Sequence, residues 1–457
     1  MRINRRKFLS LTSVGLASTM LSSAVWSKNT AALLAPLSSA KAIVDSKESF
    51  AKAIKKAKAG DTLVITNGRY HNWSAIIDCQ GSAKHGVTIR PQSVGGVVFS
   101  GVNQFTISGR YVTLDGFHFE QCVFEQNLLD FNRSEHCRIQ NCVFKDSSNK
   151  GSKKSAISIS PGAQYNHITD CRFTNIAARC VNLMMSKAMI KYGVPIGNVI
   201  AKNHFQDLPS FSGDNGFEAV KIGTNQPKYG HIDVATIVEE NLFLRCNGER
   251  EIISNKCGGN TYRNNVFQQC DGELVMRGGT NCLVEGNRFI EGAGGIRISG
   301  AGHVIKDNVI INSKGTGIRL FYGMSLVQGL HYQAPTKCLI TNNTIINAKR
   351  AGIHIGDERL NEHGENGIQT VAPENNSIIN NIITGTSGDL CMVDRAPNNL
   401  IVGNLYFAQG DAIVSFPGED PMFADPLFRD ASKGDYRLST ASPALQSNPT
   451  KGASNAQ

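Results

Sequence analysis

The sequence predicts an all-β fold, a single-stranded right-handed parallel β-helix, from three observations. A degenerate repeat of a short apolar strand, an Asn or Asp and a second apolar pair recurs, as in residues 138–144 and 167–173. Its segments are rich in Val, Ile, Phe and Thr in alternation and are separated by Gly or Asn turns, which favours strands over helices. Successive repeats are 24, 22 and 21 residues apart in the most regular stretch, the length of one coil of three short strands.

The Asn of the repeat recurs at one phase, which predicts an internal ladder. Stacked coils are separated by about 4.8 Å, so each Asn amide would bond to the same turn one coil away. A plain preference of Asn for turns is the alternative. The later copies are centred on Asn203, Asn241, Asn265, Asn287, Asn308, Asn343, Asn381 and Asn404.

Residues 1–27 resemble a twin-arginine export signal. Arg5, Arg6 and Lys7 form a basic start, and an apolar run diluted by Ser and Thr follows to about Trp26. We therefore expect a periplasmic or secreted protein. A membrane anchor is the alternative, but this run is short and weak and no later stretch could span a bilayer, so we expect no stable membrane insertion.

The remaining residues, 28–457, are predicted to form one β-helix domain with a cap at each end. Residues 46–59 show the pattern of a short amphipathic helix, with Phe50 and Ile54 on one face and Ser46 as the N-cap. Residues 415–457 depart from the repeat, and we expect this irregular segment to cover the C-terminal end of the core.

Composition narrows the classes of partner. The formal charge is +10, four of which belong to the signal, and the moderate remainder suits a polyanion. The charged site described next favours an anionic polysaccharide over nucleic acid. The twelve Cys include no CxxC pair, which argues against zinc, and we expect buried free thiols such as Cys142 and Cys171.

Charged residues recur at similar distances after the repeat Asn, which predicts a column on one face. Glu249, Glu251, Arg277 and Arg297 lie eight to twelve residues after their repeat Asn. Strand alternation then points them away from the core. Such a column suits an extended anionic polymer, whereas the alternative is an ordinary solvated sheet face.

Within this column two carboxylates are close enough to require a cation between them. Glu249 and Glu251 are predicted to project from one strand to the same side, with Asn215 approaching from the preceding coil. Hard oxygen ligands of this kind suit Ca²⁺. Salt bridges from the carboxylates to Lys256 and Arg250 are the alternative.

Lys256 and Arg277 are 21 residues apart, about one coil, and are therefore predicted to be neighbours. A free lysine, with a pKa of about 10.4, is a poor base at neutral pH. A neighbouring guanidinium and a divalent cation would lower the pKa of Lys256, because both disfavour a further positive charge. A neutral Lys256 would then be able to remove a proton from a substrate.

Three blocks of this region resemble signature segments of polysaccharide lyase family six, which contains alginate lyases and chondroitinase B. They are residues 215–223 (NGFEAVKIG), 249–256 (EREIISNK) and 276–279 (MRGG), in the order and spacing of the family. The resemblance covers most of the chain after the signal. It implies a parallel β-helix and a Ca²⁺-assisted β-elimination in a uronic-acid polymer, with a 4,5-unsaturated product.

The resemblance also implies roles for individual residues. Asn215, Glu249 and Glu251 would bind Ca²⁺, which neutralises the uronate carboxylate. Lys256 would remove the C5 proton as general base, and Arg277 would assist at the leaving glycosidic oxygen as acid or as charge stabiliser. The chain departs from the family where Gly278 follows Arg277, because the family often has His at that position.

The substrate expected from the resemblance is alginate, because residues 295–305 look more like the alginate-acting members. Dermatan sulfate is the alternative polymer, and a non-catalytic carbohydrate-binding β-helix is the alternative of another class. A hydrolase would need carboxylates on both sides of the scissile bond, which neighbouring residues on one strand do not provide. Subsite residues, which could also be exposed charges of the repeat, are expected at Arg297, Arg319, His354 and Arg359.

Overall fold

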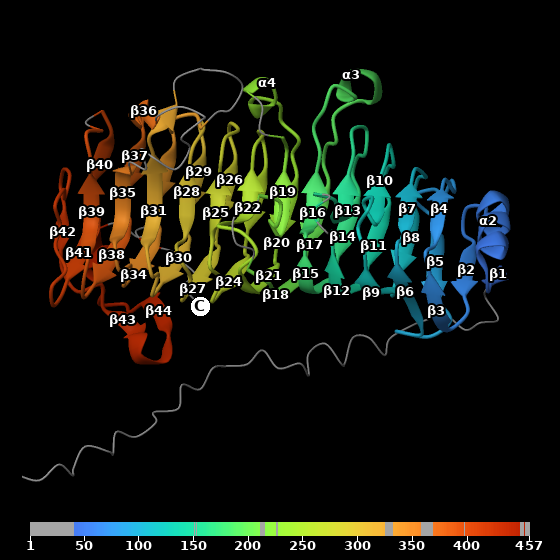
Figure 1. Cartoon of the computed structure of the whole chain (residues 1–457). Coiled ribbons are helices and arrows are strands. Elements are labelled where there is room, and N and C mark those ends of the chain that lie inside the picture. The colour runs from blue at the N-terminus through green and yellow to red at the C-terminus, as the bar shows by residue number, and fades with distance from the viewer. Residues whose placement is uncertain are drawn as a thin grey trace, which may run out of the picture. The chain divides into compact units, whose positions relative to one another are not determined.

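The computed structural model describes residues 41–149, 151, 153–210, 215–224, 227–324, 332–357, 369–396, 398–447 and 452. The predicted signal and Arg359 lie outside these residues. Within them, three long sheets are built from strands that pair in parallel with the neighbouring coils (Figure 1). The predicted parallel β-helix is confirmed.

Each coil contributes one strand to each of three sheets, named here A, B and C in the order in which the chain enters them. Sheet A consists of β1 (Ala42–Val44), β2 (Thr62–Ile65), β5 (Val87–Pro91), β8 (Val112–Asp115), β11 (Arg138–Gln140), β14 (His167–Thr169), β17 (Val199–Ala201), β20 (Ile237–Glu239), β23 (Thr261–Arg263), β26 (Leu283–Glu285), β29 (Val304–Lys306), β33 (Leu339–Thr341), β37 (Ser377–Ile379) and β40 (Leu400–Val402). Sheet B consists of β3 (Gly68–His71), β6 (Val97–Gly101), β9 (His118–Cys122), β12 (Val143–Ser148), β15 (Arg172–Ala177), β18 (His204–Leu208), β21 (Leu242–Cys246), β24 (Val266–Gln268), β27 (Arg288–Ile290), β30 (Val309–Ile311), β34 (Thr344–Ile346), β38 (Ile382–Gly385), β41 (Leu405–Ala408) and β42 (Met422–Phe423).

Sheet C carries most of the charged residues singled out from the sequence. It consists of β4 (Ser74–Ile77), β7 (Gln104–Ile107), β10 (Leu129–Phe131), β13 (Ser155–Ile159), β16 (Arg179–Leu183), β19 (Val220–Ile222), β22 (Glu251–Asn255), β25 (Glu273–Met276), β28 (Ile296–Ile298), β31 (Thr316–Phe321), β35 (Ala351–Asp357) and β39 (Asp389–Val393).

The core is filled by equivalent apolar side chains stacked coil upon coil. One stack consists of phenylalanine rings whose centroids lie 4.5 to 5.0 Å apart, close to the spacing of paired strands. Because strand side chains alternate, the residues between these rings face outward and are free to be polar. The stacked rings belong to Phe119, Phe144, Phe173, Phe205, Phe243, Phe267 and Phe289.

The predicted asparagine ladder is present at the turns from sheet A to sheet B. The Asn265 carboxamide oxygen accepts hydrogen bonds from the backbone and side-chain nitrogens of Asn241, at 3.0 Å each. Its side-chain nitrogen donates to the oxygens of Val238 and Asn287, at 2.9 and 3.0 Å. In several coils the residue before the ladder Asn has a left-handed backbone conformation, for example Asn264 with φ of 54°. The ladder therefore satisfies buried backbone groups that the tight turns leave unpaired.

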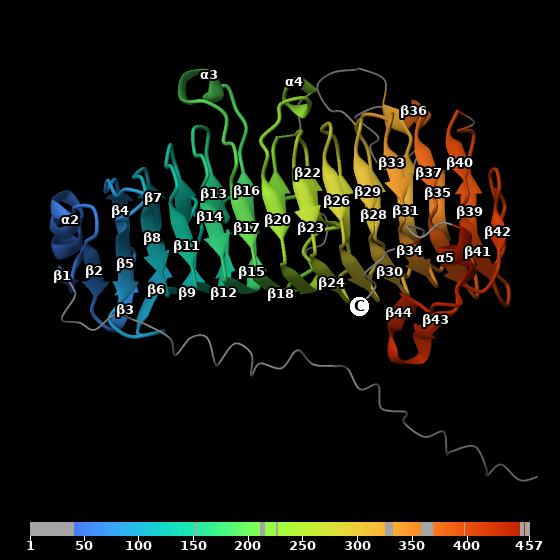
Figure 2. The same ribbon diagram turned by 180° about the vertical axis from the view of Figure 1, so that it is seen from behind.

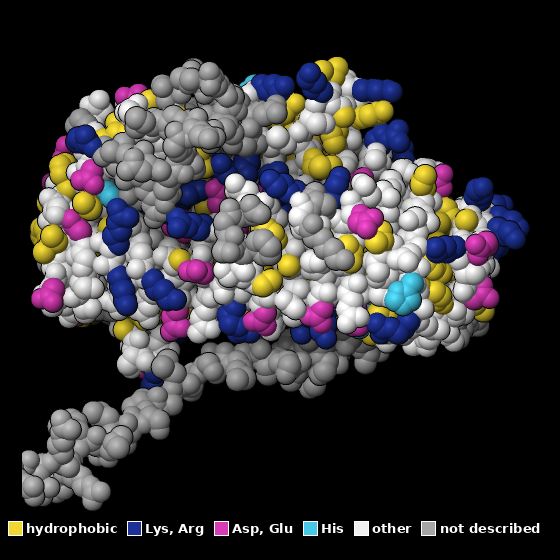
Figure 3. All heavy atoms as spheres, in the orientation of Figure 1, with side chains coloured by type: hydrophobic (Ala, Val, Ile, Leu, Met, Phe, Trp, Pro, Cys, Tyr) yellow, Lys and Arg dark blue, Asp and Glu magenta, His cyan; other side chains and the backbone are white. Residues whose placement is uncertain are grey.

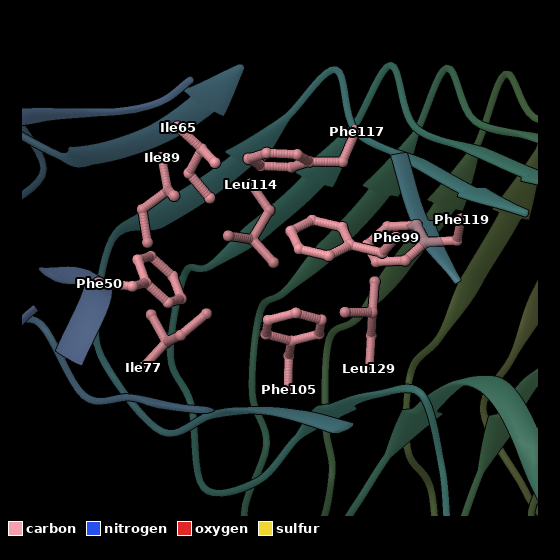
Figure 4. Close-up of a pocket in the computed structure, with 10 residues that line it drawn as sticks. All are labelled: Phe50, Ile65, Ile77, Ile89, Phe99, Phe105, Leu114, Phe117, Phe119 and Leu129. Carbon is pink, nitrogen blue, oxygen red and sulfur yellow. The ribbon is translucent and has the colours of Figure 1, made fainter. Parts of the chain in front are cut away.

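The N-terminal cap is the helix α2 (Lys47–Lys56). The Ser46 side chain accepts a hydrogen bond from the Ser49 backbone N–H, and the Ser49 hydroxyl oxygen accepts one from the Ser46 backbone N–H. Phe50 and Ile54 are buried against the core, as the sequence predicts. At its inner side lies a small, wholly apolar space lined by ten hydrophobic side chains, including Phe99 and Phe105 (Figure 4). Its ten lining side chains are all apolar, so we interpret this space as an imperfection of packing.

The C-terminal segment departs from the repeat, but much of it lies against the flank of the coils. It forms β43 (Phe428–Asp430), η2 (Ala431–Lys433), β44 (Asp435–Leu438) and α5 (Pro443–Ser447). Phe428 and Tyr436 pack against the outer side chains of sheet B, among them Val309 and Ile311.

Long insertions occur at the turns from sheet C back to sheet A, and both views show them along one edge (Figures 1 and 2). They contain α3 (Met189–Tyr192), α4 (Pro227–Gly230), β32 (Gly323–Met324) and β36 (Gln369–Val371). In the described part of the chain no helix is long and apolar enough to cross a membrane. All twelve Cys are free and buried, so the expected buried thiols are confirmed.

Candidate active site

The outer face of sheet C brings the predicted residues into register. Lys221, Ser254 and Val275 occupy successive coils at one position, followed by Arg297 and Arg319. Basic and acidic side chains gather over this face (Figure 3). Of the predicted column, Arg297 lies in this row, whereas Glu251 pairs with Glu273 and Arg277 follows the end of β25. Arg297 and Arg319 are buried rather than solvated, with 8 % and 6 % of their surface exposed.

Three carboxylates meet at the centre of this face. Ligand oxygens of Glu218, Glu249 and Glu251 all lie within 4.8 Å of one another. The expected pair is therefore close, but not for the predicted reason, since β22 begins at Glu251 and Glu249 lies in the turn before it. Sequence reasoning missed Glu218 as a site residue, although it lies within the block 215–223.

Glu251 is the most heavily paired of the three carboxylates. One oxygen contacts the guanidinium groups of Arg277, at 3.4 Å, and Arg297. The other accepts a hydrogen bond from the Ser254 hydroxyl and lies 4.0 Å from the Lys256 amine. Burial alone would raise the pKa of Glu251, but these three cations hold it far below its ordinary value. Glu251 is therefore a permanent negative charge under the site.

Glu218 is buried between two cations. Its oxygens lie 2.6 Å from the Arg179 guanidinium and 3.6 Å from the Lys256 amine. Burial opposes ionisation, yet the charges of Arg179 and Lys256 lower the pKa of Glu218 below its ordinary value. Arg179 starts β16 and was not predicted, because no motif of the sequence marks it.

Glu249 has the opposite electrostatic character. One of its oxygens accepts hydrogen bonds from the backbone N–H groups of Gly216 and Phe217, at 3.0 and 3.2 Å. Burial and the negative charge of Glu218 raise the pKa of Glu249 to about 7. Asn215 is exposed and directly precedes Gly216, whose backbone N–H donates to Glu249.

These three carboxylates fit a hard divalent cation. Glu249 has backbone donors as its hydrogen-bond partners, and ion pairs between it and a cationic side chain are absent among the described residues. Its raised pKa records the cost of a third negative charge at this point, and a bound cation would remove that cost. Clustered carboxylate oxygens are the ligands that Ca²⁺ prefers.

Lys256 and Arg277 are neighbours, as the sequence predicts. The Arg277 backbone nitrogen donates to the oxygen of Asn255, which places the two side chains on adjacent coils. Lys256 is 6 % exposed. Burial lowers the pKa of Lys256, and although Glu251 and Glu218 oppose this effect, its pKa stays below the ordinary value. The amine is therefore easier to deprotonate than a free lysine.

Arg277 stays charged in this environment. Burial would lower its pKa, but Glu251 raises it above the ordinary value. Its guanidinium carbon lies 4.7 Å from the centre of the Tyr332 ring, which stacks on the cation. The following Gly278 borders open space in the described structure, because a Cβ there would meet none of the described atoms within 4 Å. The chain therefore has room, but no side chain, where the family often has His.

The predicted subsite residues are placed as follows. Arg319 pairs with Glu273 one coil beyond the pair formed by Arg297 and Glu251, so two similar ion pairs repeat along the coils. His354 follows Arg319 in the same row and accepts or donates a 2.8 Å hydrogen bond with Asp394. Arg359 lies outside the described residues.

Known proteins resemble this chain in sequence and in fold. Residues 44–418 match the profile of the family described as Chondroitinase B. The solved PL6 family alginate lyase AlyGC is similar at 25% identity with a TM-score of 0.75; the match covers 90% of this chain but only 58% of that chain. No curated protein sequence matches.

Two further structures support the fold alone. A mannuronic acid specific polysaccharide family 6 lyase from human gut microbiota aligns with a TM-score of 0.73 at 23% identity, covering 89% of this chain and 98% of that one. The PL6 lyase Pedsa3628 from Pseudopedobacter saltans aligns with a TM-score of 0.69 at 22% identity, covering 91% and 99%. The chain belongs to the chondroitinase B family, polysaccharide lyase family six.

Proposed function

We propose that this protein is a lyase that cleaves alginate by β-elimination. The observation that carries the proposal is the buried contact set in which Lys256 and Arg277 share Glu251, beside a cluster of three carboxylates. Lys256 as a base and Arg277 as a fixed positive charge, beside a cation site, are the groups needed to remove the proton α to a uronate carboxylate.

Asn215, Glu249 and Glu251, with Glu218 beside them, would hold Ca²⁺. When bound, the ion would neutralise the carboxylate of the uronate and make its C5 proton more acidic. Glu218 is already shared between Arg179 and Lys256, so its main effect on the site is to position the lysine amine.

Lys256 removes the C5 proton in this proposal. Its amine is held by Glu218 and Glu251 at 3.6 and 4.0 Å, which fixes its direction, while burial lowers its pKa. Since the neutral amine is the base, turnover should rise with pH until Lys256 is deprotonated.

Arg277 acts as a charge stabiliser rather than as an acid. Its raised pKa makes loss of a proton unfavourable, and its guanidinium is fixed between Glu251 and the Tyr332 ring. A fixed cation stabilises the negative charge that develops as the glycosidic bond breaks. Arg297, Arg319 and His354 continue along the same face and would line further sugar subsites.

Alginate is favoured as the substrate because AlyGC, similar at 25% identity, is an alginate lyase. Dermatan sulfate is the second candidate, because the matching family profile is that of chondroitinase B. Export by the twin-arginine-like signal would place the enzyme in the periplasm or outside the cell, where polysaccharides are found.

The test is incubation of the purified protein with alginate and, separately, with dermatan sulfate, with and without EDTA. We expect the ultraviolet absorbance of an unsaturated product with alginate, and loss of the signal when EDTA removes the metal. If unsaturated product forms from dermatan sulfate but not from alginate, the proposed substrate is wrong and the proposed β-elimination stands. Binding of either polymer without any product would favour a non-catalytic carbohydrate-binding protein, and saturated products would favour a hydrolase.

A further inference from the structure

Lys221 is a basic residue of the site that none of the roles above uses. It lies on β19, in register with Asn182 of the preceding coil and Ser254 of the following one. Ser254 donates its hydroxyl hydrogen bond to Glu251, so this row leads directly into the carboxylate cluster. Lys221 therefore lies on the coil that carries Asn215 and Glu218, one coil before Glu249 and Glu251, on the side of the N-terminal coils.

Lys221 differs from the other cations of the site in its partners. Arg179, Lys256 and Arg277 each contact Glu218 or Glu251. The outer arginines are neutralised in the same way, Arg297 by Glu251 and Arg319 by Glu273. For Lys221, no carboxylate lies within ion-pair distance among the residues that the structure describes.

The surroundings of Lys221 favour an incoming anion. Burial and then the charges of Lys256 and Arg179 lower the pKa of Lys221 to about 7. The charge of Glu218 partly opposes these cations. The Lys221 side chain keeps partial access to solvent. The neighbouring Asn182 is buried, and its carboxamide oxygen has no hydrogen-bond partner in the described structure. A ligand carrying both an anionic group and hydroxyl donors would satisfy the two residues together.

We propose that Lys221 binds the carboxylate of the sugar next to the uronate held at the carboxylate cluster, towards the N-terminal coils. This inference rests on the proposed function and deepens it. Successive coils and successive sugars of an extended chain advance by similar steps, so one coil separates two neighbouring carboxylates. The site then prefers carboxylates on consecutive sugars, which a polyuronate provides and a polymer alternating uronate with an amino sugar does not.

The experiment compares Lys221→Gln and Lys221→Arg with the wild type on alginate oligosaccharides and on partly carboxyl-reduced alginate. Lys221→Gln should raise KM for alginate about tenfold, the loss of one charge-assisted hydrogen bond, with kcat changed less than threefold. Lys221→Arg should recover most of the affinity. The matched control Lys145→Gln, on the outer side of sheet B, should behave as the wild type.

Carboxyl reduction separates charge recognition from a structural role. On partly reduced alginate the ratio of the KM of Lys221→Gln to that of the wild type should fall towards one, because fewer sugars carry the carboxylate that distinguishes the two proteins. An unchanged KM in Lys221→Gln, or an equal penalty on both polymers, would overturn the inference. Calorimetric binding of a saturated alginate oligosaccharide distinguishes the two proposals: absence of cleavage by the wild type defeats the lyase function, whereas equal binding by wild type and Lys221→Gln defeats the role of Lys221.

Discussion

The cation site makes a prediction about stability that does not depend on catalysis. In Glu249→Gln the amide oxygen can still accept the hydrogen bonds from Gly216 and Phe217, while the third negative charge is removed. We expect the metal-free variant to be more stable than the metal-free wild type at pH 7.5 and equally stable near pH 4.

The magnitude follows from the pKa of Glu249. Folding raises it from 4.5 to about 7. A carboxyl whose pKa is raised in the folded state contributes stability that is complete below pH 4.5 and is lost as the pH rises through 7. At about 1.4 kcal/mol per unit, the wild type loses up to about 3 kcal/mol over this window, and Glu249→Gln does not.

Calcium should reverse the order of the two proteins. Binding stabilises the folded wild type by about 2.7 kcal/mol at a free concentration a hundred times the dissociation constant. The variant lacks a ligand and should gain much less. Thermal or denaturant unfolding of both proteins is measured under four conditions, at pH 4 and pH 7.5, each with EDTA and with Ca²⁺. Glu240→Gln, an exposed partner of Lys202, is the matched control.

The reasoning would be refuted by either of two results. One is equal stability of metal-free wild type and Glu249→Gln at pH 7.5, which would mean that the carboxylates do not repel one another as the structure implies. The other is equal stabilisation of both proteins by Ca²⁺, which would place the ion elsewhere.

Three further predictions concern the asparagine ladder, Arg277 and the thiols. Asn265→Ala removes four ladder hydrogen bonds and should lower the free energy of unfolding by about 3–5 kcal/mol. The control Asn264→Gly, at the left-handed turn, should lower it little, and similar losses in the two variants would contradict a stabilising role for the ladder. Tyr332→Leu removes the ring that stacks on Arg277 and should lower kcat about five- to thirtyfold. Tyr332→Phe keeps the ring and should keep the wild-type rate. Equal rates for wild type and Tyr332→Leu would show that stacking on Arg277 does not contribute to catalysis. Thiol titration in denaturant without reductant should find twelve reactive thiols, and a lower count would reveal disulfides.

Much of the site could be predicted because the repeat fixes which residues are neighbours. The interval of 21 residues between Lys256 and Arg277 is one coil, and the structure places them on adjacent coils. Arg297, Arg319 and His354, expected as subsite residues, lie in one row of successive coils. In a solenoid, residues one repeat apart in the sequence are in contact in three dimensions, so the repeat length predicts contacts.

The residues that were missed lie where the period breaks. Arg179 pairs with Glu218 across 39 positions, because an insertion containing α3 separates β16 from the next coil. Glu249 was assigned to a strand, but β22 begins two residues later and is irregularly paired with β25 at its start. No periodic pattern encodes the length of an insertion or a bulge, so these contacts needed the structure.

The account depends most directly on Lys256 as the base that takes the uronate proton. The decisive measurement is the rate of unsaturated product formation from alginate by Lys256→Met, with Ca²⁺ stabilisation and oligosaccharide binding measured on the same sample. We predict a loss of at least about a thousandfold in kcat while calcium binding and oligosaccharide binding persist. A variant that keeps its fold, its calcium and a rate near that of the wild type would contradict the mechanism.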